Sequence, residues 1–533
     1  MKPRLLFTAA LLVLLSCSQP VTYDLVISGG QLIDGSGSPA IRSDIGIKDG
    51  RIIKVGDLTG AKSLQLIDAT GLVVAPGFID VHAHIEQLMR LPDAESKVRQ
   101  GVTTCLGGPD GSGPLPLGRY LDSLEHHFNL GMNVGYLAGH NSIRNSVMGN
   151  ANRQPSEKEM EDMKALVTQS MKEGAFGLST GLLYMPGTFS KTDEVIALAR
   201  VAGSMGGIYT SHLRKEGLGL LDGVKEAMII GREANIPVVL THHKAIGKRM
   251  WGASKITTAM VDSARKAGID VMMDQYPYTA SSTSLSVLLP SWSLAGSDED
   301  FIKRLNKKQK KDSILAGIRF NIMNDRGGGD LHLIQFSSVP WDSTLNGLTL
   351  HDYLVRLGQE PNIDNGVNLV LQMQLKGGAS CIYHAMSEED VERIMRHPFT
   401  MHASDGALVK FGEGHPHPRA YGTFPKILGE YVRNKKVLTL EEAIRKMTSL
   451  PASRLGLKDR GLLKEGMMAD IAVFNPATIA DLSSFTDPHH FPAGIEYVVV
   501  NGNVTVSSHQ MTDARGGQVL RGPAFTAPAS GNR

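Results

Sequence analysis

The stretch APGFIDVHAH, residues 75–84, decides the fold. Residues 78–84 are a candidate strand, and the alternation of side chains along a strand places His82 and His84 on one face. Two imidazoles at the carboxyl end of a barrel strand form half of a metal site. This short pattern is weak alone, because paired histidines also occur on ordinary surfaces.

Seven further segments resemble this strand, and amphipathic stretches with helical spacing separate several of them. The eight candidate strands cover residues 78–84, 102–107, 133–140, 175–180, 207–212, 237–243, 270–276 and 399–405. Eight strand–helix units over roughly 250 residues or more are typical of a TIM barrel with insertions. We therefore predict an α/β fold with a TIM (β/α)8 barrel at residues 75–454. A doubly wound sheet is the alternative.

Short strands also occupy both ends of the chain. Asp49-Gly50 and Asn501-Gly502 are strong hairpin signals between apolar segments. Two strand-rich ends around a different middle predict one small β-sandwich domain, built from residues 22–74 and 455–510. Residues 511–533 follow it as a C-terminal tail.

One interval, between residues 278 and 399, breaks the strand–helix rhythm. It is too long for a plain loop in a compact domain, so we predict an inserted subdomain at about residues 285–365. Its basic run, residues 303–311, is interpreted as a solvated helix face. Lysine plus arginine exceed aspartate plus glutamate by only two, 55 against 53, and this balance gives no electrostatic footprint for nucleic acid.

The N-terminus has the layout of a secretory signal. Lys2 and Arg4 precede an apolar run at residues 5–15 that is too short to span a bilayer. The following Leu14-Leu15-Ser16-Cys17 resembles a bacterial lipobox, which implies removal of residues 1–16 and lipidation of Cys17. We therefore expect an extracytoplasmic, periplasmic lipoprotein whose only membrane contact is that anchor. An ordinary signal peptide is the alternative.

Metal-binding side chains end three more candidate strands. His212 ends the fifth strand, His242 and His243 end the sixth, and Asp405 ends the eighth. Because barrel strands end on one face, these groups are expected to converge with the first histidine pair. Imidazole with carboxylate suits Zn²⁺ and related ions. His243 is left out, because it lies one step along the strand from His242 and should point to the other face.

Several short motifs carry a resemblance to a known family. They are PGFIDVHAH (76–84), QGVTT (100–104), GLSTGLLYMPG (177–187), SHLR (211–214), THHK (241–244), DQYPY (274–278), ASDG (403–406) and HPRAYGTFP (417–425). From residue 23 to about 506, the chain resembles the amidohydrolase superfamily and, within it, the D-aminoacylases (N-acyl-D-amino-acid deacylases). The resemblance implies one or two zinc ions, held by His82, His84, His212 and His242, with Asp405 as the catalytic acid and base.

The sequence departs from the family pattern at the bridging ligand. D-aminoacylases carry a cysteine shortly after the second strand, where this chain has Asp110, and Cys105 lies five residues earlier. A carboxylate can also bridge divalent ions, so we expect Asp110 to replace the thiolate. Cys105 is interpreted as a buried structural thiol.

The resemblance also implies contacts with a substrate carboxylate. Arg419 matches the family arginine, and a guanidinium suits the bidentate geometry of a carboxylate. Lys244, Tyr278 and Ser282 lie where the family contacts its substrate. The expected ligand is therefore a small molecule with a free carboxylate.

The resemblance implies hydrolysis of N-acyl-D-amino acids to a carboxylate and a free D-amino acid, with a metal-bound water as nucleophile. A dipeptidase acting on peptides that contain D-amino acids is the alternative. A cyclic-amide hydrolase is less favoured, because no strand carries an obvious lysine for carbamylation. A metal-binding lipoprotein without catalysis is the remaining alternative from another functional class.

Overall fold

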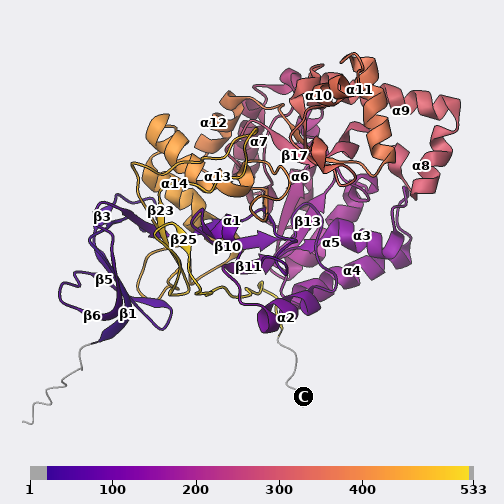
Figure 1. Ribbon diagram of the computed structural model, residues 1–533. Coiled ribbons are helices and arrows are strands. Elements are labelled where there is room, and N and C mark those ends of the chain that lie inside the picture. The colour runs from indigo at the N-terminus through magenta and orange to yellow at the C-terminus, as the bar shows by residue number, and fades with distance from the viewer. Residues whose placement is uncertain (1–20, 527–533) are drawn as a thin grey trace, which may run out of the picture.

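The computed structural model describes residues 21–526, so the expected signal peptide and Cys17 lie outside the described residues. A large α/β body carries a small β domain at one end and a mainly helical subdomain at the other (Figure 1). Among the described helices, none combines the length and the apolar character needed to cross a bilayer.

The body is built on parallel strands that follow one another around a ring. They are β8 (Phe78–Asp80), β10 (Val102–Gly107), β11 (Asn133–Tyr136), β12 (Ala138–Gly139), β13 (Gly177–Gly181), β14 (Ile208–His212), β15 (Val238–Leu240), β16 (Val271–Gln275) and β20 (Thr400–His402). They pair in the orders β11-β10-β8 and β12-β13-β14-β15-β16-β20. Since β11 and β12 are successive parts of one strand, the ring has the eight predicted strands.

A short pairing closes the ring between the first and last strands. Strand β9 (Ala83–His84) pairs in parallel with β21 (Gly406–Ala407), and the Asp405 N–H donates to the His82 carbonyl at 2.8 Å. Apolar side chains fill the interior, among them Ile79, Leu106, Leu137, Phe176, Ile208, Val239 and Met401. The predicted TIM barrel is confirmed, and a doubly wound sheet is excluded because such a sheet stays open.

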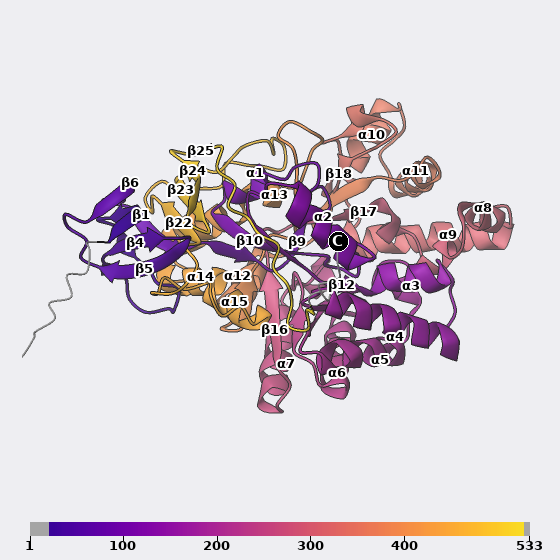
Figure 2. The ribbon, with the colours of Figure 1, turned by 90° about the horizontal axis from the view of Figure 1, so that it is seen from below.

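Helices cover the outside of the barrel (Figure 2). They include α2 (Leu117–His127), α3 (His140–Met148), α4 (Glu157–Lys172), α5 (Thr192–Ser204), α6 (Leu220–Ala234), α7 (Ser254–Lys266), α12 (Glu388–Arg396), α13 (Arg419–Lys426) and α14 (Leu440–Met447). Helix α4 begins at a capping box, in which Ser156 and Glu159 each accept a backbone N–H from the other residue. Buried leucine, valine and methionine side chains pack these helices against the strands.

The small β domain takes strands from both ends of the chain. One sheet, in the order β5-β4-β1-β6, comes from the N-terminal part: β1 (Thr22–Ser28), β4 (Asp44–Lys48), β5 (Arg51–Gly56) and β6 (Lys62–Asp68). The other joins β2 (Gln31–Leu32), β3 (Ile41–Arg42) and β7 (Val73–Pro76) to β22 (Ile471–Phe474), β23 (Ile495–Val500), β24 (Asn503–Ser507) and β25 (Gln510–Met511). An apolar core that includes Leu25, Ile47 and Val499 draws on both sheets.

The inserted subdomain has a core of its own, formed by residues from Leu285 to Tyr383. An antiparallel sheet in the order β17-β19-β18 is formed by β17 (Ser281–Ser284), β18 (Ile334–Ser338) and β19 (Ser380–Tyr383). Helices α8 (Asp298–Leu305), α9 (Lys308–Asn321), α10 (Leu350–Arg356) and α11 (Ile363–Leu375) complete it. The insertion therefore extends past the predicted limit at about residue 365, because β19 returns to pair with β17.

The C-terminal segment runs back along the barrel. The Gly517 N–H donates to the Leu130 carbonyl at 2.8 Å, and the Leu520 N–H donates to the Val134 carbonyl at 2.7 Å. These acceptors lie at the start of β11, so the segment that was predicted as a tail contacts the amino-terminal end of the barrel.

Candidate metal centre and active site

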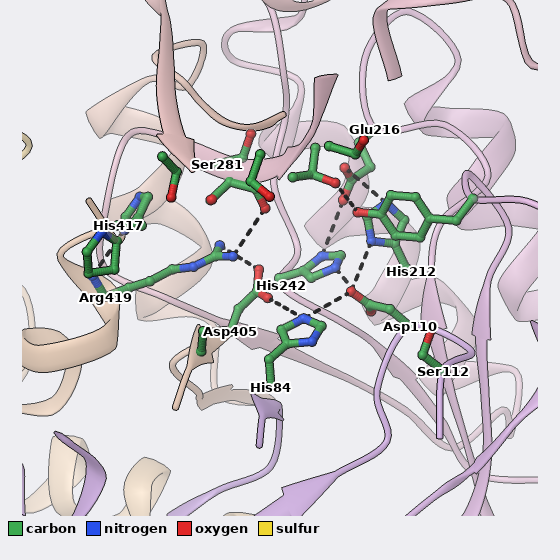
Figure 3. Close-up of a pocket in the computed structure, with 18 of the residues that line it drawn as sticks. His84, Asp110, Ser112, His212, Glu216, His242, Ser281, Asp405, His417 and Arg419 are labelled. Atoms are coloured by element: carbon green, nitrogen blue, oxygen red, sulfur yellow. Dashed lines mark hydrogen bonds and ion pairs between the residues drawn. The ribbon is translucent and has the colours of Figure 1, made fainter. Parts of the chain in front are cut away.

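A cavity of about 310 Å³ opens at the carboxyl ends of the barrel strands. Barrel residues form one wall and the inserted subdomain forms the other (Figure 3). The wall residues with polar side chains near the strand ends are His84, Asp110, Tyr184, His212, Glu216, His242, Lys244, Asp405 and Arg419, and those from the insertion include Ser281, Ser282, Thr283 and Arg326. The cavity therefore holds most of the residues that the sequence predicted to meet.

Asp110 lies at the centre of four imidazoles. One or other of its carboxylate oxygens is 3.5 Å from His82 Nε2, 3.6 Å from His84 Nε2, 3.5 Å from His212 Nδ1 and 3.4 Å from His242 Nε2. The donor atoms form two compact groups. One contains Asp110 with both strand-1 histidines and Asp405, and the other contains Asp110, His212 and His242. Asp110 belongs to both groups.

Three residues of the two donor groups have a left-handed backbone conformation. The φ angles are 55° at Asp110, 36° at His242 and 48° at Asp405. Such a conformation costs on the order of 1–3 kcal/mol for a residue other than glycine, and it persists where the surroundings hold it. The His242 N–H donates to the buried Asp274 carboxylate at 2.6 Å, which holds that residue in place. All three of these residues line the cavity.

The first strand departs from the simple alternation that the sequence suggested. Strand β8 ends at Asp80 and β9 begins only at Ala83, so His82 and His84 do not share one unbroken strand. Their imidazoles still converge, because the Nε2 atoms of His82 and His84 lie 3.5 and 3.3 Å from the same oxygen of Asp405.

The donor set fits a divalent cation. Both nitrogens of His82 and of His212, Nε2 of His242 and one oxygen of Asp110 are buried without a hydrogen bond to any described residue, although buried polar atoms are normally bonded. Burial alone would lower the pKa of His82, but the carboxylates of Asp110 and Asp274 outweigh it and raise the pKa to about 10. The buried carboxylates therefore favour a positive charge within the cluster. A metal ion would supply that charge.

Asp405 pairs with Arg419 beside this cluster. Arg419 Nη1 donates to Asp405 Oδ2 at 2.6 Å, and Nη2 donates to the Ser282 carbonyl at 3.3 Å. Burial would raise the pKa of Asp405, but the Arg419 guanidinium and the nearby imidazoles hold it well below its usual range. Asp405 is therefore an ionised carboxylate with one oxygen facing the histidines and the other facing a guanidinium.

One candidate for substrate binding, Tyr278, lies outside the cavity. The Tyr278 hydroxyl donates to Asp481 at 2.8 Å, and Tyr278 is not among the cavity-lining residues, which differs from the expected substrate contact. Asp481 draws the hydroxyl toward the segment after β22. His243 was not assigned to the metal site. Its Nε2 forms a 2.8 Å hydrogen bond with the Thr257 hydroxyl in α7. Cys105 is buried in β10, and burial raises the pKa of its thiol well above the usual value.

Comparisons with known proteins agree with this geometry. The amidohydrolase family model matches residues 65–313 and 368–506. An N-acyl-D-glutamate deacylase of Alcaligenes xylosoxydans xylosoxydans is 36% identical over 529 residues, which cover 95% of this chain and 98% of that protein. The chain belongs to the amidohydrolase family.

Solved structures of amidohydrolases are also similar. The N-acyl-D-glutamate deacylase of Bordetella bronchiseptica, in complex with zinc and a phosphonate mimic of the tetrahedral intermediate, is 33% identical with a TM-score of 0.81. A D-aminoacylase described with a binuclear metal centre is 33% identical with a TM-score of 0.79. Each match covers 94% of this chain and 100% of the other.

Two charged residues of this amidohydrolase were missed by sequence reasoning. Glu216 follows His212 by four residues and contacts His212, His242 and Lys244. The sequence signal that could have identified Glu216 is an acidic residue shortly after the end of a barrel strand. Arg326 comes from the insertion and is buried in the cavity wall. No periodic pattern places a residue from such a segment.

Because Asp110 contributes to both donor groups, Asp110→Ala is expected to weaken metal binding at both. Zinc content after dialysis, measured by atomic absorption, should fall below that of the wild-type protein. Asp110→Cys is the matched control, since a thiolate is a good zinc ligand, and it should keep more zinc than the alanine variant. Wild-type zinc content and affinity in Asp110→Ala would contradict this role.

Proposed function

We propose that the protein hydrolyses N-acyl-D-amino acids to a carboxylate and a free D-amino acid. The observation that carries this proposal is the ion pair between Asp405 and Arg419 at the edge of the histidine cluster. In this pair Asp405, which can accept a proton, lies beside Arg419, which can bind a substrate carboxylate. The D configuration is taken from the named relatives, an N-acyl-D-glutamate deacylase and a D-aminoacylase.

Zinc is the proposed cofactor, as in the similar deacylase structure. His82 and His84 would hold one ion with Asp110, while Asp110, His212 and His242 would hold another, in agreement with the two donor groups. Asp405, which lies in the first group, is left for proton transfer. Bound zinc supplies Lewis acidity, which activates water and polarises the scissile carbonyl.

Asp405 is the proposed general base and general acid. Its low pKa keeps it ionised at neutral pH, so it can accept a proton from the attacking water. It then returns that proton to the leaving nitrogen, which would otherwise depart as a poor leaving group. The oxygen of Asp405 that lies near His82 and His84 would make this transfer, since the other oxygen is bound by Arg419.

Arg419 is the proposed partner of the substrate carboxylate. One side of its guanidinium is bound to Asp405, and its Nη2 donates only a 3.3 Å hydrogen bond to the Ser282 carbonyl. A carboxylate that enters the cavity would share this guanidinium with Asp405, which would bring the scissile amide close to the metal ligands. Ser282 lines the same wall, and Lys244 is buried on the opposite side of His242 from Asp110.

The proposed reaction is tested by amine release from matched substrates. Purified zinc-loaded protein is assayed with N-acetyl-D-amino acids, their L enantiomers, and dipeptides that carry a C-terminal D-residue. We expect release from the N-acetyl-D series and little from the L series. Turnover of the dipeptides alone would favour a dipeptidase, and no release from any compound would refute hydrolysis of linear amides.

Asp405→Asn is expected to keep the cavity shape but lose the proton acceptor. Since general acid–base catalysis contributes about 10²–10⁴-fold, kcat should fall by at least about that factor. KM and zinc content serve as the controls and should change far less. Near-normal turnover in this variant would reject Asp405 as the acid and base.

We further propose that the mature protein is extracytoplasmic and anchored to a membrane through lipidated Cys17. The support is the signal-like N-terminus and the lipobox-like run before Cys17. Mass spectrometry of the N-terminal peptide from the membrane fraction should detect a lipid-modified Cys17, and Cys17→Ala should release the protein from that fraction. An unmodified Cys17 in the mature wild-type protein would exclude the anchor.

A further inference from the structure

A fully buried lysine, Lys97, binds the chain on both sides of Asp405. It belongs to the short helix α1 (Glu95–Val98), and none of its side chain is exposed. Its Nζ donates to the Ser404 hydroxyl at 2.6 Å and to the Gly406 carbonyl at 2.8 Å. One ammonium group therefore contacts both chain neighbours of the proposed acid and base.

The carboxylate of Asp80 completes this contact. Asp80 ends β8 and is also fully buried, and its Oδ2 lies 3.4 Å from Lys97 Nζ. Its Oδ1 accepts the backbone N–H of Ser404 at 2.9 Å, and the Ser404 hydroxyl donates to Oδ2. The same hydroxyl accepts the N–H of Gly406 at 2.9 Å. Because buried charges need a partner and hydrogen bonds, this ion pair meets that need and orders the turn at residues 404–406.

Asp405 needs such support, because its backbone is strained. Its φ of 48° lies in the left-handed region, where a residue other than glycine stays only if its surroundings hold it. The Asp405 N–H donates to the His82 carbonyl, which holds one side of the turn. Lys97 holds the other side through the carbonyl of Gly406. Glycine permits this approach, since a Cβ at residue 406 would lie 3.1 Å from Lys97 Nζ and 2.8 Å from the Arg419 carbonyl oxygen.

We propose that Lys97 is a positioning residue for Asp405. It holds the backbone at Ser404 and Gly406, and this keeps one oxygen of Asp405 at the histidines and the other at Arg419. Lys97 is not among the cavity-lining residues, so it acts through Asp405 and not by touching a substrate. The role in proton transfer rests on the proposed function, whereas the position of the carboxylate can be measured without it.

The first test is the crystal structure of Lys97→Met, which removes the ammonium group but keeps a long unbranched side chain. In the wild-type protein an oxygen of Asp405 lies 3.3 Å from His84 Nε2. This carboxylate is expected to move by about 1 Å, a displacement large enough to slow catalysis strongly. An unmoved carboxylate in Lys97→Met would overturn the proposal.

Lys446→Met is the matched control. Lys446 is also fully buried, and it donates to the His397 and Thr400 carbonyls at the start of β20, the end of the strand that is farther from Asp405. Both variants remove a buried ammonium group that binds the same part of the barrel, so both are expected to lower the thermal midpoint. Only Lys97→Met should move Asp405, and an equal movement in the control would overturn the proposal.

A double-mutant cycle on kcat tests whether Lys97 acts through Asp405. Lys97→Met alone should lower kcat by about 10²-fold, the loss that a misplaced catalytic group can cause, while zinc content stays unchanged. Added to Asp405→Asn, it should cause little further loss, because the proton acceptor is already absent. An equal further loss in the double variant would overturn the proposal, since Lys97 would then act by another route.

A second variant covers the case in which Asp80, left without its cation, prevents folding. Asp80→Asn combined with Lys97→Met removes both charges, and the asparagine oxygen can still accept the Ser404 N–H. Circular dichroism establishes whether this protein is folded, and the same movement of Asp405 is expected. Wild-type protein that hydrolyses no linear amide would refute the proposed function, whereas the position of Asp405 in the variant structures would still decide the role of Lys97.

Discussion

The site depends on one buried carboxylate that four imidazoles share. Asp110 can occupy that position only if its backbone adopts a left-handed turn after β10 and if the first, fifth and sixth barrel strands end at the same level. Closing the ring between β9 and β21 brings Asp405 to the opposite side of the same histidines. The closed barrel is therefore a geometric requirement of the site.

Much of this arrangement could be predicted from residue patterns. Short apolar segments predicted the positions of the barrel strands. Histidine or aspartate residues at the ends of these strands indicated which face of the barrel holds the active site. The direction of a side chain just past a strand end could not be predicted, because it depends on backbone angles that the local sequence does not set. Tyr278, whose hydroxyl donates to Asp481, is an example.

The two walls of the cavity have different origins. Barrel strands supply the metal-binding side chains, and the insertion supplies Ser281, Ser282, Thr283 and Arg326. The insertion has a hydrophobic core separate from that of the barrel. It still contacts the site, because the Ser282 carbonyl accepts from Arg419 and Arg326 Nη2 lies 3.9 Å from Glu216 Oε2. Sequence periodicity detected the insertion but could not position its individual residues, since the irregular backbone near Arg326 carries no repeating pattern.

The small β domain has a consequence for how the chain folds. Strand β7 pairs with β22, which lies almost four hundred residues later in the chain. Their sheet can therefore be completed only after the C-terminal part of the chain is available. Contacts between such distant segments form slowly. A chain that ended before β22 would leave one edge of β7 unpaired and part of the apolar core of this domain uncovered, and an exposed strand edge of this kind favours aggregation.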